Sequence, residues 1–312
     1  MDKNRVRFEL AAPHKNEWVS EARQYFFGPE GKGAAPALLS VKNELLSLST
    51  YRDFSTMWLR AGDLFDEKVN DGFAQADANL STFFSGKDFG EEVLGAMQPE
   101  VQLVVARQTF ADNQPQPAIK VPSFALVFRL KDPETMKPDF RRTFTSLIGF
   151  LNVIGAMNGQ PQLDLDIDKN EDRQIVTASY LPDKAGATRA GLKIYYNFSP
   201  SVAFVGDHFI VSSTKELVGE LLDVVDHEAA PREPVNTAMR TNLSGVHDIL
   251  ADNRGQLVAQ NMIGEGHTKA EAEHEIDVLL QLISMLRDAS LEMKTSNDTI
   301  RVTFELSLAA PQ

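Results

Sequence analysis

Five oxygen-bearing side chains recur at every second position of one segment: Asp164, Asp166, Asp168, Asn170 and Asp172. Oxygen ligands at this spacing are what a calcium loop provides. In the calcium-binding pattern, however, Lys169 stands where a glycine makes the turn, and Ile175 stands where a bidentate glutamate belongs. The three aspartates alternate with Leu163, Leu165 and Ile167, as in a strand with one apolar and one solvated face. We therefore favour a strand that runs into a polar turn.

A second candidate metal site is formed by His267, Glu271 and His274, which are spaced four and three residues apart. On one helix these side chains would share a face and could bind zinc. Thr268 and Glu271 also match a capping box, in which a hydroxyl and a carboxylate bind the first free amides of a helix. This cap would place His267 before the helix and leave His274 towards water. We predict no bound metal.

The segment from Ser212 to Lys215 matches the Ser-x-x-Lys signature of penicillin-recognising enzymes, in which the lysine takes the proton of the serine. The partner motif Ser-x-Asn is missing, and Lys294-Thr295-Ser296 lacks the required glycine. Ser213 and Glu216 match another capping box, so we predict the start of a helix here.

Two further patterns fall short of a site. The glycine-rich loop 28–33 has Phe26 where the first glycine of a P-loop belongs, and Gly33 follows its lysine in place of Ser or Thr. His247 and Asp248 are neighbours in a predicted helix, where their side chains would diverge by about 100°. We therefore predict no catalytic residue and no cofactor.

One predicted helix, residues 140–157, has almost no polar face. Its apolar residues are Phe140, Phe144, Leu147, Ile148, Phe150, Leu151, Val153 and Ile154. A helix that is apolar all round is buried on both sides or covers a hydrophobic cavity. We expect burial in the core, with a cavity for a lipid or an apolar peptide as the alternative.

The composition excludes several classes of partner. The chain has 312 residues, a net charge of −13 and 43% apolar residues. So negative a surface repels phosphate backbones and anionic lipids, which makes nucleic acid an unexpected partner. The longest apolar stretch, 147–157, is about half of a bilayer span, so we expect no transmembrane segment. The first residues contain no apolar signal region. The absence of cysteine favours a place outside a bacterial cytoplasm.

The elements that would position these residues form an α+β protein. The N-terminal third is expected to be largely helical after a short strand at 6–10, with helices up to residue 27, from residue 36 through Leu45 and Leu46, and over 54–84. We divide the chain into a helical segment, 1–98, and an antiparallel sheet domain, 99–312, in one compact unit. Short turns between strands favour this topology, with the helices on one face.

The second part is assigned from alternation and turn signals. Strands are expected at 101–110, 121–131, 163–168, 174–181, 192–198, 202–205, 209–212, 290–294 and 300–308. Helices are expected at 138–157, 215–225, 243–263 and 269–287.

Residues 5–10 nearly repeat residues 301–306, as Arg-Val-Arg-Phe-Glu-Leu and Arg-Val-Thr-Phe-Glu-Leu. This match indicates that the first strand closes a preceding, similar unit. Because its backbone groups need partners, it should pair with an exposed sheet edge, in this chain or in a second molecule.

Several segments resemble an uncharacterised bacterial family of long, exported proteins of unknown function. They are residues 84–94, 101–108, 124–133, Asn253-Arg254 and 257–262. The likeness runs from about residue 80 to the end. It implies a location in the bacterial envelope or periplasm, with this chain as part of a longer precursor, and it contributes no site residues. We expect a non-enzymatic extracytoplasmic domain that binds protein or an apolar ligand. The alternative is a hydrolase whose site is assembled from distant residues.

Overall fold

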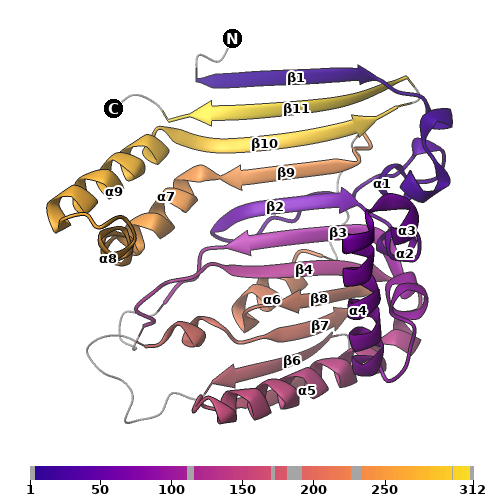
Figure 1. Cartoon of the computed structure of the whole chain (residues 1–312), viewed down its shortest axis with the longest axis horizontal. Coiled ribbons are helices and arrows are strands. Elements are labelled where there is room, and N and C mark those ends of the chain that lie inside the picture. Colours follow the sequence, from indigo (N-terminus) through magenta and orange to yellow (C-terminus); the bar gives the residue numbers. More distant parts are fainter. Residues whose placement is uncertain are drawn as a thin grey trace.

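The protein is built on one large antiparallel sheet (Figure 1). The computed structural model describes residues 4–110, 116–169, 173–180, 192–225, 233–296 and 298–309. Eleven strands follow one another in the order β1-β11-β10-β9-β2-β3-β4-β8-β7-β6-β5, and the neighbours pair antiparallel. The expected α+β class with an antiparallel sheet is confirmed.

The strands are β1 (Arg5–Pro13), β2 (Glu44–Tyr51), β3 (Met97–Ala106), β4 (Ser123–Leu130), β5 (Leu163–Lys169), β6 (Arg173–Tyr180), β7 (Ser201–Val205), β8 (His208–Ser212), β9 (Thr237–Asn242), β10 (Leu286–Thr295) and β11 (Thr299–Leu308). The helices are α1 (Gln24–Phe27), α2 (Phe54–Leu59), α3 (Ala61–Leu64), α4 (Glu67–Phe83), α5 (Pro133–Met157), α6 (Lys215–Leu222), α7 (Leu243–Asp252), α8 (Arg254–Glu265) and α9 (Lys269–Ser284).

The expectation of a largely helical N-terminal third is wrong. This part of the chain contributes β1, β2 and the start of β3, and helices were expected where β2 and the turns before it lie. In β2, the buried Ser47 and Ser49 alternate with leucines, and their hydroxyls donate to the carbonyls of Leu39 and Pro36 at 2.7 Å each. The segment before β2 is extended because it lies across the sheet. Strands from 1–98 therefore share one sheet with strands from 99–312.

Other boundaries also differ from the prediction. The expected strand at 192–198 contains a 3-10 turn, Ile194–Asn197, and the strand β9 was not expected at all. The expected helix 243–263 is divided at Asn253 into α7 and α8. The last expected helix ends at Ser284, because β10 begins at Leu286.

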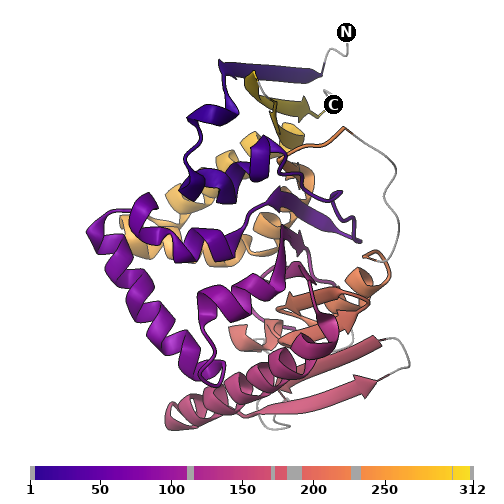
Figure 2. The same ribbon diagram turned by 90° about the vertical axis from the view of Figure 1, so that its right-hand side faces the viewer.

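Helices pack on both faces of the sheet, and not on one as expected. On one face, α5 buries Phe140 and Ile148 against Val202, Phe204 and other residues of β6 to β8. On the other face, α6 buries Leu217 and Leu221 against neighbouring strand residues of opposite parity. In Figure 2, α4 and α5 lie on the left side of the strands and α6 on the right. Alternate residues of the same strands thus serve two separate cores.

A smaller third core joins the C-terminal helices. Val258 of α8 packs against Ala272, Ile276 and Leu280 of α9. Figure 2 places α8 and α9 on the same side of the sheet as α5. Within the described residues, no helix has both the length and the apolar character needed to span a bilayer.

The two similar hexapeptides lie side by side at one edge of the sheet. β1 pairs antiparallel with β11, and Phe8 stands opposite Phe304. The prediction that the first strand pairs with a sheet edge is confirmed, and the edge belongs to the same chain.

Candidate functional site

The sheet face that carries α5 continues well beyond that helix as an apolar surface. Strand register places one large apolar residue from each of seven neighbouring strands in a single row. The row consists of Leu126, Leu103, Leu48, Met239, Leu291, Phe304 and Phe8. We call this row and its apolar neighbours on β1 and β4 (Val6, Leu10 and Phe124) the open sheet face.

None of the seven residues in the row is buried. Phe124 and Leu126 of β4 are 49% and 37% exposed, and Phe8 at the far end is 62% exposed. The same row continues under α5 through Val211 to Val202 and Val176, of which the last two are fully buried. The row is therefore covered at Val202 and Val176, under α5, and open from β4 to β1.

The apolar helix α5 is also only half covered. Phe144 and Ile148 are buried, whereas Phe150, Val153, Ile154 and Met157 are exposed. The expectation that this helix is buried all round is wrong, because the helix lies at the end of the sheet and the strands cover only one side of it. The exposed residues from Leu147 to Met157 are all apolar or glycine, whereas the first half of the helix exposes polar residues such as Arg142 and Ser146.

The helices that stand on this side of the sheet (Figure 2) also carry exposed apolar residues. In α9, Val278, Leu279 and Leu282 are between 40% and 58% exposed, and Met285, which follows the helix, is 59% exposed. Where α4 meets α5, Phe83 and Phe150 make an edge-on contact with 5.8 Å between ring centres, and both remain partly exposed. Large exposed apolar surfaces of this kind mark binding sites in soluble proteins.

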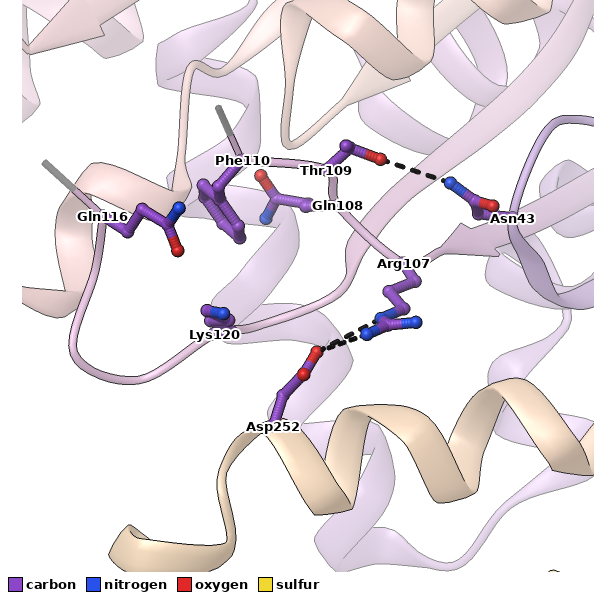
Figure 3. Close-up of a pocket in the computed structure, with 8 residues that line it drawn as sticks. All are labelled: Asn43, Arg107, Gln108, Thr109, Phe110, Gln116, Lys120 and Asp252. Atoms are coloured by element: carbon purple, nitrogen blue, oxygen red, sulfur yellow. Dashed lines mark hydrogen bonds and ion pairs between the residues drawn. The ribbon is translucent and has the colours of Figure 1, made fainter. Parts of the chain in front are cut away.

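A polar pocket lies where the segment after β3 meets α7 (Figure 3). It encloses about 250 Å³, and Arg107 lies between two carboxylates of α7. Its guanidinium donates to Asp252 Oδ2 at 2.7 Å and to Asp248 Oδ2 at 3.1 Å. Because two acids neutralise one arginine, this cluster does not attract an anion.

Two asparagines hold the extended segment that lines this pocket. Asn253 accepts from the amide of Lys120 and donates to its carbonyl, both at 2.8 Å. From the other side, Asn197 accepts from Val121 N at 3.0 Å and donates to Ile119 O at 2.9 Å. Each side-chain amide replaces a strand neighbour. The break between α7 and α8 at Asn253 and the 3-10 turn at Asn197 therefore have a structural role, because they present the two asparagines to this segment.

The hydroxyl groups near this pocket bind the backbone. Ser123 Oγ donates to Ala106 O at 3.1 Å, Ser199 Oγ accepts from Lys215 N at 2.9 Å, and Thr214 Oγ1 caps α6. Each hydroxyl has a structural role. The geometry thus supplies no activated nucleophile among these three groups.

The acidic segment proposed for calcium forms the strand β5, as favoured above, with Asp164, Asp166 and Asp168 on one face. Asn170 and Asp172 lie outside the described residues. Thr268 and Glu271 form the predicted capping box of α9, and His274 is exposed as expected. His267 precedes the helix and bonds Asn261 at 3.0 Å. Among the described residues, no group of three or more histidine and acidic side chains could hold a metal ion.

The Ser-x-x-Lys segment starts a helix at Lys215, as predicted, but the N-cap lies one residue after the Ser213 of the predicted capping box. The N-cap of α6 is Thr214, whose hydroxyl accepts from Leu217 N, and Ser213 Oγ accepts instead from Phe124 N at 2.8 Å. The ammonium group of Lys215 lies 3.6 Å from Asp166. The hydroxyl of Ser213 is thus engaged with the neighbouring strand β4.

The two remaining candidate sites, His247–Asp248 and the glycine-rich loop 28–33, also have structural roles. His247 Nδ1 lies 3.4 Å from Asp248 Oδ1, so these side chains do not diverge as expected, but Asp248 is shared with Arg107. In the loop 28–33, Gly28 and Gly31 have positive φ values of 78° and 70°, which make the tight turns of a loop. Neither arrangement forms a triad or a phosphate cradle.

Comparison with protein-family models, with curated proteins and with solved structures found no match to this chain. The function of this protein must therefore be inferred from its own residues. The open sheet face was not predicted, although the alternation of Leu103 and Val105 with buried Val104 carried a signal for it. That signal identifies two faces of a strand and cannot show that one of them stays uncovered.

Proposed function

We propose that this protein is a non-enzymatic binding module that takes an apolar ligand, or an apolar segment of a partner protein, on the open sheet face. The observation that supports this proposal is the row of large apolar residues, one from each of seven neighbouring strands. None of these seven residues is buried. Covering such side chains releases about 25 cal/mol for each Å² removed from water.

The helices beside the row support the same proposal. Exposed residues of α5 and α9, such as Ile154 and Leu282, provide further apolar surface on the same side of the sheet. A ligand that lies against the strands could therefore also contact the helices. The Arg107 pocket offers the hydrolase alternative no comparable support among the described residues, because its arginine is neutralised by Asp248 and Asp252.

The test is native mass spectrometry of the protein purified from its own host. We expect an added mass on the wild-type protein that is lost in the double variant Phe124→Gln/Leu126→Gln. Both side chains are partly exposed, so the variant should fold. Ile263→Gln, which changes an 87% exposed residue of α8, is the matched control and should keep the added mass. Wild-type protein without any added mass, or equal loss in the control, would contradict the proposal.

We also propose an extracytoplasmic location. The absence of cysteine supports it, since unpaired thiols are a hazard where disulfides form. The resemblance of residues 84–94 and 124–133 to an exported family points the same way. Protease accessibility in intact host cells with a permeabilised outer layer tests this location, and protection until the inner membrane is broken would contradict it.

A further inference from the structure

Among the residues that the structure describes, no strand pairs with the outer side of β1, and the pairing pattern shows which of its backbone groups point outwards. Leu308 N donates to Asn4 O at 2.8 Å, and His14 N donates to Asp298 O at 3.0 Å. In an antiparallel pair, successive residues turn their backbone groups alternately towards and away from the partner strand. The even-numbered residues of β1 therefore bond β11, and Arg5, Arg7, Glu9 and Ala11 direct their amides and carbonyls outwards.

The opposite edge of the sheet is protected, which makes β1 unusual. At that edge, Asn152 of α5 binds both backbone groups of Leu163 in β5, and α5 lies along this end of the sheet (Figure 1). The aspartates of β5 all share one face and would repel a second β5. Proteins protect edge strands in such ways to prevent unwanted pairing.

β1 combines free backbone groups with exposed apolar side chains. It runs for nine residues without a register shift, and Val6, Phe8 and Leu10 are 38%, 62% and 70% exposed. A long, regular edge with apolar side chains is a template for another strand. Its charged residues, Arg5, Arg7 and Glu9, include both signs, so they do not repel every partner.

Because residues 301–306 of β11 nearly repeat residues 5–10, β1 pairs with a near copy of its own sequence. Phe8 stands opposite Phe304, Val6 opposite Leu306, and Arg7 opposite Glu305. When residues 301–306 are aligned with residues 5–10, Phe304, Leu306 and Glu305 correspond to Phe8, Leu10 and Glu9. The sequence of β1 is thus complementary to itself when Phe8 faces Phe8.

We propose that two copies of this chain pair through β1 in that register, as a two-fold dimer with one continuous sheet. Phe8 would face Phe8 of the second copy, Val6 would face Leu10, and Arg7 would face Glu9. A shift of the pairing by two residues in one direction would place Arg7 opposite Arg7, and a shift in the other direction would place Glu9 opposite Glu9. Like charges repel in both shifted pairings, so charge selects the proposed register. An isologous contact of this kind closes at two copies.

The absence of cysteine allows a direct test by disulfide formation. In this register, Phe8 and its mate form a non-hydrogen-bonded pair with about 4.5 Å between Cα atoms, which a disulfide can span. We expect Phe8→Cys to form a covalent dimer under mild oxidation about tenfold faster than Val6→Cys or Leu10→Cys, because pairing raises the effective thiol concentration. An equimolar mixture of Val6→Cys and Leu10→Cys should cross-link faster than either variant alone.

The three substitutions change exposed side chains, so each reduced variant should keep the melting temperature of the wild type within a few degrees. Sedimentation of the wild-type protein over a range of concentrations provides the second readout. A small edge contact should give a dimer that dissociates on dilution. A wild type that stays monomeric at its highest soluble concentration, species larger than dimers, or equal cross-linking rates for all variants would overturn the proposal.

Discussion

The side-chain amide of Asn152 bonds both backbone groups of Leu163, accepting from its N–H at 2.7 Å and donating to its C=O at 2.9 Å. Asn152 belongs to α5, and Leu163 is the first residue of the edge strand β5 and is buried. The asparagine thus supplies the hydrogen bonds that a further strand would supply. It also fixes the end of α5 against the sheet.

Asn152→Ala should lower the free energy of unfolding by about 2 kcal/mol, because it leaves a buried N–H and C=O without these partners. Asn158→Ala, at the residue that follows α5, is the matched control. It removes an exposed bond to Ile154 O, so its effect should stay within about 0.5 kcal/mol. Urea denaturation measures both variants. Equal effects for the two would show that Asn152 does not stabilise the strand edge.

The two sides of α5 should respond differently to a buried charge. Ile148 is 1% exposed, so Ile148→Asp should unfold the protein or cost several kcal/mol. Ile154 is 40% exposed, so Ile154→Asp should be far less damaging than the burial expected for this helix would imply. A loss of about 1 kcal/mol is the revised expectation. Thermal unfolding followed by circular dichroism tests the pair, and equally severe losses would show that something covers the free side of α5.

The capping box of α9 predicts a further stability difference. Thr268→Ala removes the side chain that accepts from Glu271 N, and the unfolding free energy should fall by about 1 kcal/mol. Thr268→Ser keeps the hydroxyl and should be close to the wild type. His267→Ala changes the residue before the cap and should be nearly neutral. A large loss of stability in His267→Ala, together with stabilisation of the wild type by added zinc, would contradict the cap.

The same cap should be visible as a pH effect. Hydrogen bonds from Thr268 to the Glu271 carboxylate lower the pKa of Glu271 below its ordinary value of 4.5. A carboxylate with a lowered pKa in the folded state stabilises the protein above its unfolded pKa, and this contribution is lost as the pH falls through the folded pKa. The stability gap between wild type and Thr268→Ala should therefore narrow below pH 4.5. In the variant, NMR titration should show the pKa of Glu271 rising towards its ordinary value.

The features that the sequence predicted well are local ones. The capping box depends on two residues three positions apart, and the hairpin β10–β11 depends on two adjacent runs of alternating residues. The strands β2 and β9 were missed, and they lie side by side in the middle of the sheet. Leu48 meets Met239 across almost two hundred residues of chain, so no local signal marks the pair. The adjacent Leu45 and Leu46 instead suggested a helix.

The candidate binding surface was out of reach for a similar reason. The sequence showed that α5 is apolar all round, and such a pattern is compatible with burial or with an open site. Exposure of Ile154 or Leu126 depends on which helices cover which strands. That arrangement is set by packing between distant segments, and so the surface emerged only from the fold.

The last prediction concerns removal of residues 1–12, which takes away nearly all of β1. All nine residues of this strand are exposed, and its apolar contacts with β11 are cross-strand pairs such as Phe8 with Phe304. Three such pairs contribute roughly 1–3 kcal/mol in total. The shortened protein should therefore stay folded with a modestly lower melting temperature.

Ala289→Asp provides the contrast, because it places a charge at a 9% exposed position of the inner strand β10 and should be more damaging than the whole truncation. The truncation should also abolish pairing of two copies through β1 in sedimentation experiments. If removal of residues 1–12 prevents folding, β1 is an essential strand of this sheet, and the interpretation of residues 5–10 as the closing strand of a preceding unit is wrong. If the shortened protein folds but still dimerises, the copies pair through another surface.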